Sequence, residues 1–111
     1  MGESEHDRQL ADDLLTALRT VIDPELGLDI VALGLVYHAS IHEGEARIVY
    51  TLTSPACPLG SLIEAEIEIA VSEVDGVDSV QSRLVFDPAW TPERMTLEAQ
   101  DVLGYTRAPR R

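Results

Sequence analysis

The sequence predicts a single α+β domain with two layers, in which helices pack on one face of a small mixed or antiparallel sheet. Three observations predict this class. The 111 residues suffice for one hydrophobic core and are too few for two. Hydrophobic residues make up 45% of the chain, which suits a compact domain. The spacing of apolar residues alternates between the helical and the strand period in the order α-β-β-α-β-α.

The first helix is expected from about Asp7 to Val21, because apolar residues recur there every three or four positions. It ends before Pro24. The next segment, from Asp23 to Gly34, mixes turn residues with apolar ones and has no sustained period, which predicts a structured loop with one short turn of helix. Because this loop is unusually apolar, it should pack against the core.

Two runs of alternating polarity follow, joined through Glu43-Gly44, and they predict a β-hairpin. A two-residue turn would place Tyr37 opposite Tyr50 on the core face. The other face is expected to be polar and either solvated or used for contacts. Its residues are His38, Ser40, His42, Arg47, Val49 and Thr51.

The second half of the chain predicts a helix, a strand and a closing helix. The first of these follows Pro58 and ends at Asp75-Gly76, where glycine suits the C-terminal cap. Its apolar face consists of Ile63, Ile67, Ala70, Val71 and Val74. The third strand is expected from Val77 to Phe86. The closing helix should begin at an N-cap Thr91 with Pro92 in the first position, and end before Gly104.

Charge and composition narrow the classes of partner and the location. With 20 acidic and 8 basic residues, the formal net charge is -12, which disfavours nucleic acid and anionic membranes as partners. The polar, acidic start lacks the features of a signal peptide, and one cysteine excludes an internal disulfide, so a cytoplasmic protein is expected. The expected organisation is a mobile N-terminus at 1–7, a domain at 8–104 and a basic tail at 105–111.

Cys57 is the only cysteine, and it lies between a strand-like and a helix-like run. Because Pro58 favours the first position of a helix, Cys57 is expected at the N-cap. The unpaired N–H groups and the helix dipole would stabilise a thiolate there, which makes the sulfur a better nucleophile and metal ligand. The competing interpretation is a small, buried and inert cap residue.

Other candidate sites are weaker on spacing alone. The acidic cluster of Asp23, Glu25 and Asp29 could bind a hard cation, but Asp23 followed by Pro24 is also a good structural cap. His38 and His42 would lie about 13 Å apart on one strand, too far to share an ion. No nucleotide-binding loop or serine-nucleophile elbow is present in the sequence.

Three stretches together resemble the SufT and PaaD-like family of iron–sulfur cluster assembly factors. They are Ile22-Asp23-Pro24-Glu25 leading to Leu33-Gly34-Leu35-Val36, then Thr53-Ser54-Pro55-Ala56-Cys57-Pro58, and then Asp87-Pro88-Ala89-Trp90 followed by Met95-Thr96. The resemblance covers about residues 8–104. It implies a domain similar to the C-terminal domain of the NifU scaffolds. The absence of a CxxC pair and of a cysteine-rich extension points to the short SufT-like branch.

The resemblance implies a role in maturing iron–sulfur proteins, with Cys57 as the functional thiol. Asp23 and Glu25 would line the same region as Thr53, Ser54 and Pro58. A cluster usually takes four thiolates, so a chain with one cysteine would have to share any cluster.

The first hypothesis is therefore a non-enzymatic carrier or adaptor. Cys57 would give one ligand to a transient cluster or iron atom that bridges two protomers of a homodimer, or this chain and a client. Its partners would be iron–sulfur assembly proteins and client apo-proteins, and no tightly bound cofactor is expected. The alternatives are a thiol enzyme in which Cys57 is the nucleophile, and a structural adaptor that recruits partners through the exposed hairpin face.

Overall fold

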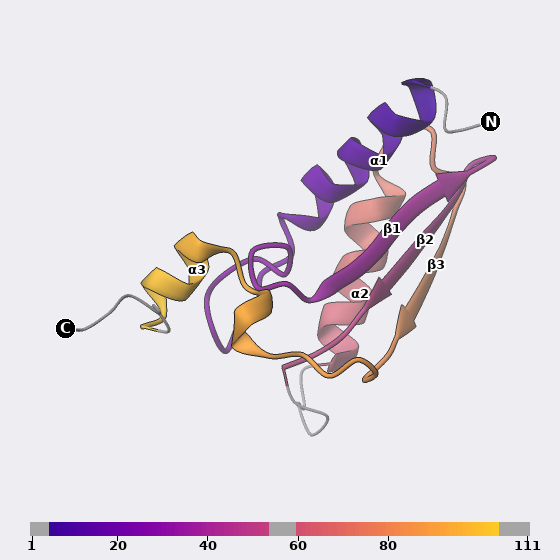
Figure 1. Cartoon of the computed structure of the whole chain (residues 1–111). Coiled ribbons are helices and arrows are strands. Elements are labelled where there is room, and N and C mark those ends of the chain that lie inside the picture. Colours follow the sequence, from indigo (N-terminus) through magenta and orange to yellow (C-terminus); the bar gives the residue numbers. More distant parts are fainter. Residues whose placement is uncertain (1–4, 54–59, 105–111) are drawn as a thin grey trace.

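The computed structural model describes residues 5–53 and 60–104, with side chains from residue 9 onward. The elements follow the predicted order and confirm the α+β class (Figure 1). They are α1 (Glu5–Leu18), β1 (Val36–His42), β2 (Glu45–Tyr50), α2 (Gly60–Ser72), β3 (Ser79–Leu84), the 3-10 turn η1 (Pro92–Arg94) and α3 (Leu97–Val102).

The sheet is mixed, with the strand order β1-β2-β3. β1 pairs with β2 in antiparallel fashion through the hairpin, whereas β3 pairs with β2 in parallel. The parallel pair requires a crossover connection, and α2 supplies it. α1 and α2 lie on the same side of the sheet and contact each other, which gives the two layers (Figure 1).

The core fills the space between the helices and the sheet. The helical period of α2 buries Ile63, Ile67 and Val71, as the apolar spacing predicts. From the sheet, Ala46, Ile48 and Tyr50 of β2 face the helices, because side chains two apart on a strand share a face. In the described part of the chain, the other large apolar side chains that are fully buried are Leu14, Leu18, Val21, Ile30, Leu33 and Leu35.

The hairpin turn is the predicted two-residue turn, but the register changes further along. Glu43 and Gly44 both have positive φ, at 51° and 84°, as in a type I′ turn. A β-bulge then makes Val36, rather than Tyr37, the partner of Tyr50. The prediction that Tyr37 faces Tyr50 in the core is therefore wrong. The Tyr37 hydroxyl instead donates to the Pro88 carbonyl at 2.9 Å.

Thr51 also departs from the prediction, because it is fully buried rather than exposed on the polar face. Its N–H donates to the Leu35 carbonyl at 2.8 Å. The segment after β3 bonds both Tyr37 and the Leu33 carbonyl, which lie on the β1 side of the sheet. It must therefore pass across the end of β2. This crossing, absent from the hairpin pattern, encloses the end of the strand.

The third strand is shorter than predicted, since β3 ends at Leu84 rather than Phe86. Leu84 and Phe86 are 39% and 42% exposed. β3 is an edge strand, so fewer neighbours cover it.

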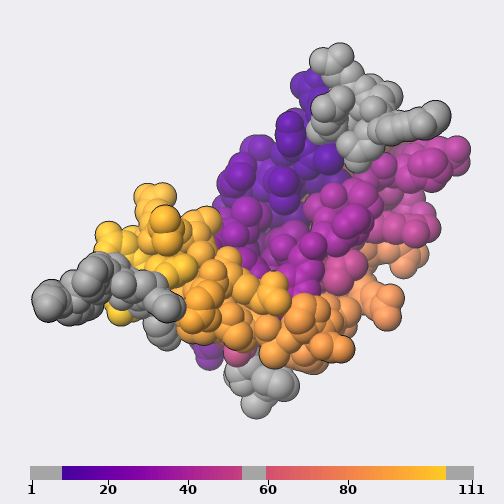
Figure 2. Space-filling model, viewed as in Figure 1, coloured from indigo at the N-terminus to yellow at the C-terminus, as the bar shows by residue number. Residues whose placement is uncertain are grey.

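The closing helix is broken in two. Thr91 precedes η1 but makes no side-chain cap bond, whereas Thr96 caps α3 by accepting from the Ala99 N–H at 3.1 Å. Between them Met95 has an extended backbone and is buried, because its side chain belongs to the core. The segment from β3 onward, orange to yellow, lies against the purple and magenta surface of the preceding loop and β1 in Figure 2.

Candidate functional site

Asp23 organises the loop that leads into β1. Its side chain is nearly buried, and Oδ1 accepts from the N–H groups of Glu25 and Leu26 at 2.8 and 3.3 Å. Its carbonyl accepts from the Gly27 N–H at 2.7 Å, which closes one helical turn. This is the local cap expected from the Asp-Pro-Glu sequence.

The other two carboxylates of the acidic cluster have different surroundings. Asp29 repeats the capping arrangement, since its Oδ2 accepts from the N–H groups of Val31 and Ala32 at 3.0 and 2.9 Å. Glu25 is exposed, and no described residue makes a hydrogen bond or ion pair with its carboxylate. Of the three, Glu25 is the carboxylate left open to solvent and to a ligand.

A series of backbone hydrogen bonds ties this loop to the end of β2. The Ile30 N–H donates to the Val21 carbonyl at 3.0 Å, and the Leu35 N–H donates to the Ile30 carbonyl at 3.0 Å. The Thr51 N–H then donates to Leu35. The loop and the residues after β2 thus lie at one end of the sheet (Figure 1).

Residues on both sides of the Thr-Ser-Pro-Ala-Cys-Pro motif are placed. Thr53 is half-buried after β2, whereas Ser54, Cys57 and Pro58 lie outside the described residues. Gly60 begins the described part of α2, and a Cβ added there would lie 3.0 Å from Leu52 Cδ1. Leu52 and Gly60, which flank the motif on either side, therefore lie close together.

The Thr51 hydroxyl is the polar group of this region that the sequence does not reveal. Its Oγ1 is buried and has no hydrogen-bond partner in the described part of the chain. A buried hydroxyl without a partner costs about 1–3 kcal/mol of stability. The alternation of the second strand predicts Thr51 on the polar face, so the sequence pattern does not signal its burial.

Trp90 and Arg94 brace the same end of the sheet. The Trp90 Nε1–H donates to the Leu33 carbonyl at 2.7 Å, which supports its interpretation as a packing anchor. The Arg94 guanidinium lies 4.7 Å from the centre of the Tyr37 ring, within range of a cation–π contact. The Asp-Pro-Ala-Trp string signals the first contact, and no sequence pattern signals the second.

Tyr50 is the titratable group whose surroundings change its chemistry most clearly. It is 2% exposed on the core face. Burial, followed by the nearby Glu64 and Glu68 carboxylates, raises the pKa of Tyr50 to about 12. Its phenol therefore keeps its proton to a higher pH than an ordinary tyrosine does.

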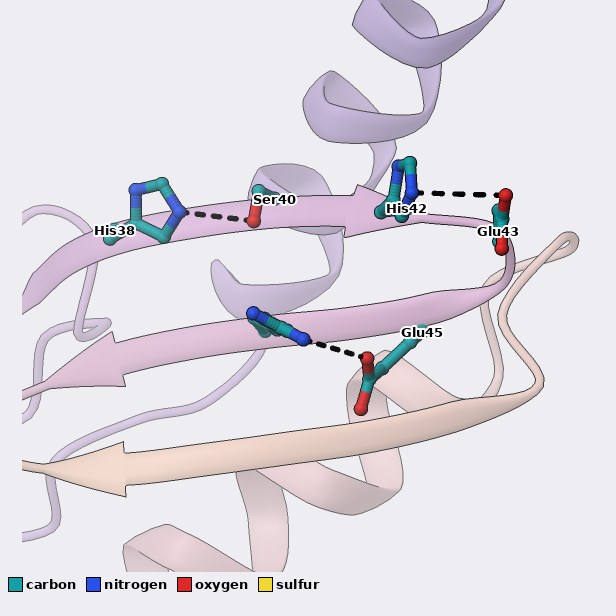
Figure 3. Close-up of polar contacts among 6 residues, drawn as sticks. His38, Ser40, His42, Glu43 and Glu45 are labelled. Carbon is teal, nitrogen blue, oxygen red and sulfur yellow. Dashed lines mark hydrogen bonds and ion pairs between the residues drawn. The ribbon is translucent and has the colours of Figure 1, made fainter.

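The two histidines with described side chains, His38 and His42, do not form a metal site with each other. His38 bonds Ser40 at 3.0 Å, and the exposed His42 lies 3.8 Å from Glu43, both on the face of the sheet turned away from the helices (Figure 3). Within residues 5–53 and 60–104, no three His, Cys, Asp or Glu side chains are grouped so as to hold a metal ion.

No helix in the described ranges combines the length and apolar character needed to cross a membrane.

Residues 11–82 match the model of a family described as "Iron-sulfur cluster assembly protein". The chain is similar to the Fe-S protein maturation auxiliary factor YitW of Bacillus subtilis, with 41% identity over 86% of this chain and 94% of the relative. The maturation auxiliary factor SufT of Staphylococcus aureus is 40% identical over 76% of this chain and 97% of its own.

A solved structure shares the whole fold. The crystal structure of a domain of unknown function, DUF59, from Bacillus anthracis superposes with a TM-score of 0.86 at 36% identity, covering 92% of this chain and 98% of that one.

Proposed function

Because the chain belongs to the iron–sulfur cluster assembly protein family, we propose that it is a maturation factor that handles a cluster or iron as cargo through Cys57. The observation that carries this proposal is its similarity to a maturation auxiliary factor over 94% of that protein's length. The expected resemblance to the SufT family is confirmed by the matching family and by the SufT relative.

The number of thiolate ligands that the chain can supply supports a cargo that is shared and transient. The chain has one cysteine, and an iron–sulfur cluster usually takes four thiolates. The described carboxylates and histidines form no group that could replace the missing thiolates. The remaining ligands would then come from a second protomer, an assembly protein or a client, which makes this chain a non-enzymatic carrier or adaptor in the cytoplasm.

The two acidic residues of the Asp-Pro-Glu motif receive different roles in this proposal. Asp23 already accepts two backbone hydrogen bonds and is nearly buried, so it positions the loop. Glu25 is exposed and its carboxylate has no partner among the described residues, so this carboxylate is available to contact iron or a client. Thr53, Ser54 and Pro58 belong to the same motif and are proposed to shape the surroundings of Cys57.

The test is anaerobic reconstitution with iron and sulfide in the presence of an apo-protein client, comparing the wild type with Cys57→Ser. We expect Cys57→Ser to lose cluster transfer, while Glu25→Gln lowers transfer without loss of stability. Asp29→Asn is the control, because it changes a carboxylate of the same loop that caps the backbone. It should lower stability and leave cluster transfer unchanged. Equal transfer by wild type and Cys57→Ser would refute the role of Cys57.

The same samples separate the carrier from a thiol enzyme. If the chain is a carrier, the visible absorbance of the sample rises and falls with its cluster content. The cluster is then released without a covalent adduct on the protein. An enzyme forms a covalent intermediate on Cys57, which mass spectrometry detects as added mass after quenching.

A further inference from the structure

The face of the sheet opposite the helices is open and has three cross-strand rows. Ser82 on β3 donates to Glu68 of α2 at 3.0 Å, so its strand neighbours Gln81 and Arg83 point to the opposite side. Pairing then aligns the open face into three rows. They are His42, Glu45 and Ser79, then Ser40, Arg47 and Gln81, and then His38, Val49 and Arg83.

Charge is divided between the two layers. The chain carries -12 overall, yet this face holds two of the four arginines whose side chains are described, Arg47 and Arg83, and one carboxylate, Glu45. The helix layer is acidic, with Glu64, Glu66 and Glu68 on α2 alone. Exposed cationic groups therefore gather where the acidic groups of the chain are sparse.

Side chains of the open sheet face surround a depression of about 550 Å³. Its lining includes His38, Glu45, Arg47, Val49, Gln81 and Arg83. Half-buried Val49 gives it an apolar centre between His38 and Arg83. Polar and cationic groups around an apolar centre suit a peptide that carries carboxylates.

The two arginines are not equally available. Arg47 is partly neutralised by Glu45, because the Glu45 Oε1 lies 3.2 Å from the Arg47 Nη2. Figure 3 labels Glu45 and marks this ion pair with a dashed line. Arg83 is exposed and makes no ion pair or hydrogen bond with any residue in the described ranges. A carboxylate that arrives at this face meets an unpaired guanidinium at Arg83 and must displace Glu45 at Arg47.

We propose that this open face, the surface of nine residues in the three rows, binds an extended acidic segment of a partner protein. The negative net charge does not prevent this, because the Debye length is about 8 Å at physiological ionic strength and the helix layer lies behind the sheet. Two arginines are too few to track the phosphates of a nucleic acid. A second copy docked through its acidic helix layer would make a head-to-tail contact, which produces closed rings or open filaments rather than a two-fold dimer.

The experiment measures anisotropy of a fluorescein-labelled oligo-glutamate peptide with the full-length protein. We expect Arg83→Ser to weaken binding about fivefold, as an exposed ion pair allows, and Arg47→Ser to weaken it less. Glu45→Gln should strengthen binding about twofold, because it frees Arg47. Arg19→Ser, an exposed arginine after α1, is the matched control and should leave the affinity unchanged.

Several results would overturn the proposal. These are equal weakening by Arg19→Ser, unchanged affinity with Glu45→Gln, equal binding of an oligo-glutamine peptide, and tighter binding of duplex DNA. Self-association of the protein that Arg83→Ser abolishes, seen by analytical ultracentrifugation, would assign the face to a second copy instead. Binding should survive Cys57→Ser, so this proposal and the thiol role can fail separately.

Discussion

Tyr50 sits where the hydrophobic layer meets the acidic helix. Its ring belongs to the core, and its phenol is desolvated near Glu64 and Glu68. Ionising it would put a negative charge into an apolar region beside two carboxylates. Burial therefore raises the pKa of Tyr50 from the ordinary value of 10.0 to about 12.

This shift predicts a loss of stability at alkaline pH. Between pH 10 and 12 the unfolded chain has released the Tyr50 proton while the folded chain still holds it, so the free energy of unfolding falls as pH rises. The full effect is about 3 kcal/mol. Urea unfolding across this range should show the slope in wild type and a shallower one in Tyr50→Phe. Equal slopes for the wild type and Tyr50→Phe would contradict the assignment.

Some residues of the candidate site can be placed from the sequence, and others cannot. The Asp23 cap follows from an Asp-Pro-Glu string, because its hydrogen bonds reach N–H groups only two and three positions away. Thr51 could not be placed in this way. Its alternating position predicts an exposed residue, whereas the tertiary structure buries it completely.

At the scale of elements, α1, α2 and the hairpin turn could be predicted because their signals are local. The apolar period of α2 predicts the buried face of that helix, and Glu43-Gly44 predicts the tight turn of the hairpin. The bulge at Tyr37 and the break at Met95 were missed. Both serve distant contacts, the first to Pro88 and the second to the core, and neither leaves a period in the sequence.

The loop before β1 must approach η1 closely, and Gly34 permits that contact. It has a φ of +74°, and a Cβ added there would collide with the Arg94 carbonyl oxygen. Gly27 has nearly the same φ of +75°, but nothing lies within 4 Å of its added Cβ. The two glycines share a positive φ and differ in what surrounds them.

Alanine at the two positions should separate backbone strain from collision. Gly27→Ala should lower the free energy of unfolding by about 1–2 kcal/mol, the cost of a left-handed conformation. Gly34→Ala should cost at least about 3 kcal/mol, because overpacking adds to the same strain. Urea unfolding of both variants measures the difference. Equal losses would mean that η1 moves aside without cost.

For the whole molecule, the net charge of -12 opposes the compact state through self-repulsion. Raising salt from about 10 to about 150 mM shortens the Debye length from roughly 30 to roughly 8 Å. We expect the Tm to rise by roughly 4 °C, equivalent to about 1 kcal/mol for a domain of this size. Glu66→Gln should reduce the rise, as monitored by circular dichroism. A Tm that falls with added salt would show that attractive pairs outweigh the repulsion.

The Thr-Ser-Pro-Ala-Cys-Pro motif lies in sequence between β2 and β3, and this position has a consequence for the order of folding. The β1–β2 hairpin closes over two residues and can form within microseconds, but β3 can join β2 only after the crossover has closed. Cys57 lies inside that crossover. On a chain emerging from the ribosome, the thiol is therefore synthesised before β3, and the pairing of β3 with β2, the most distant in sequence among the described strand pairs, can form only after Cys57 has emerged.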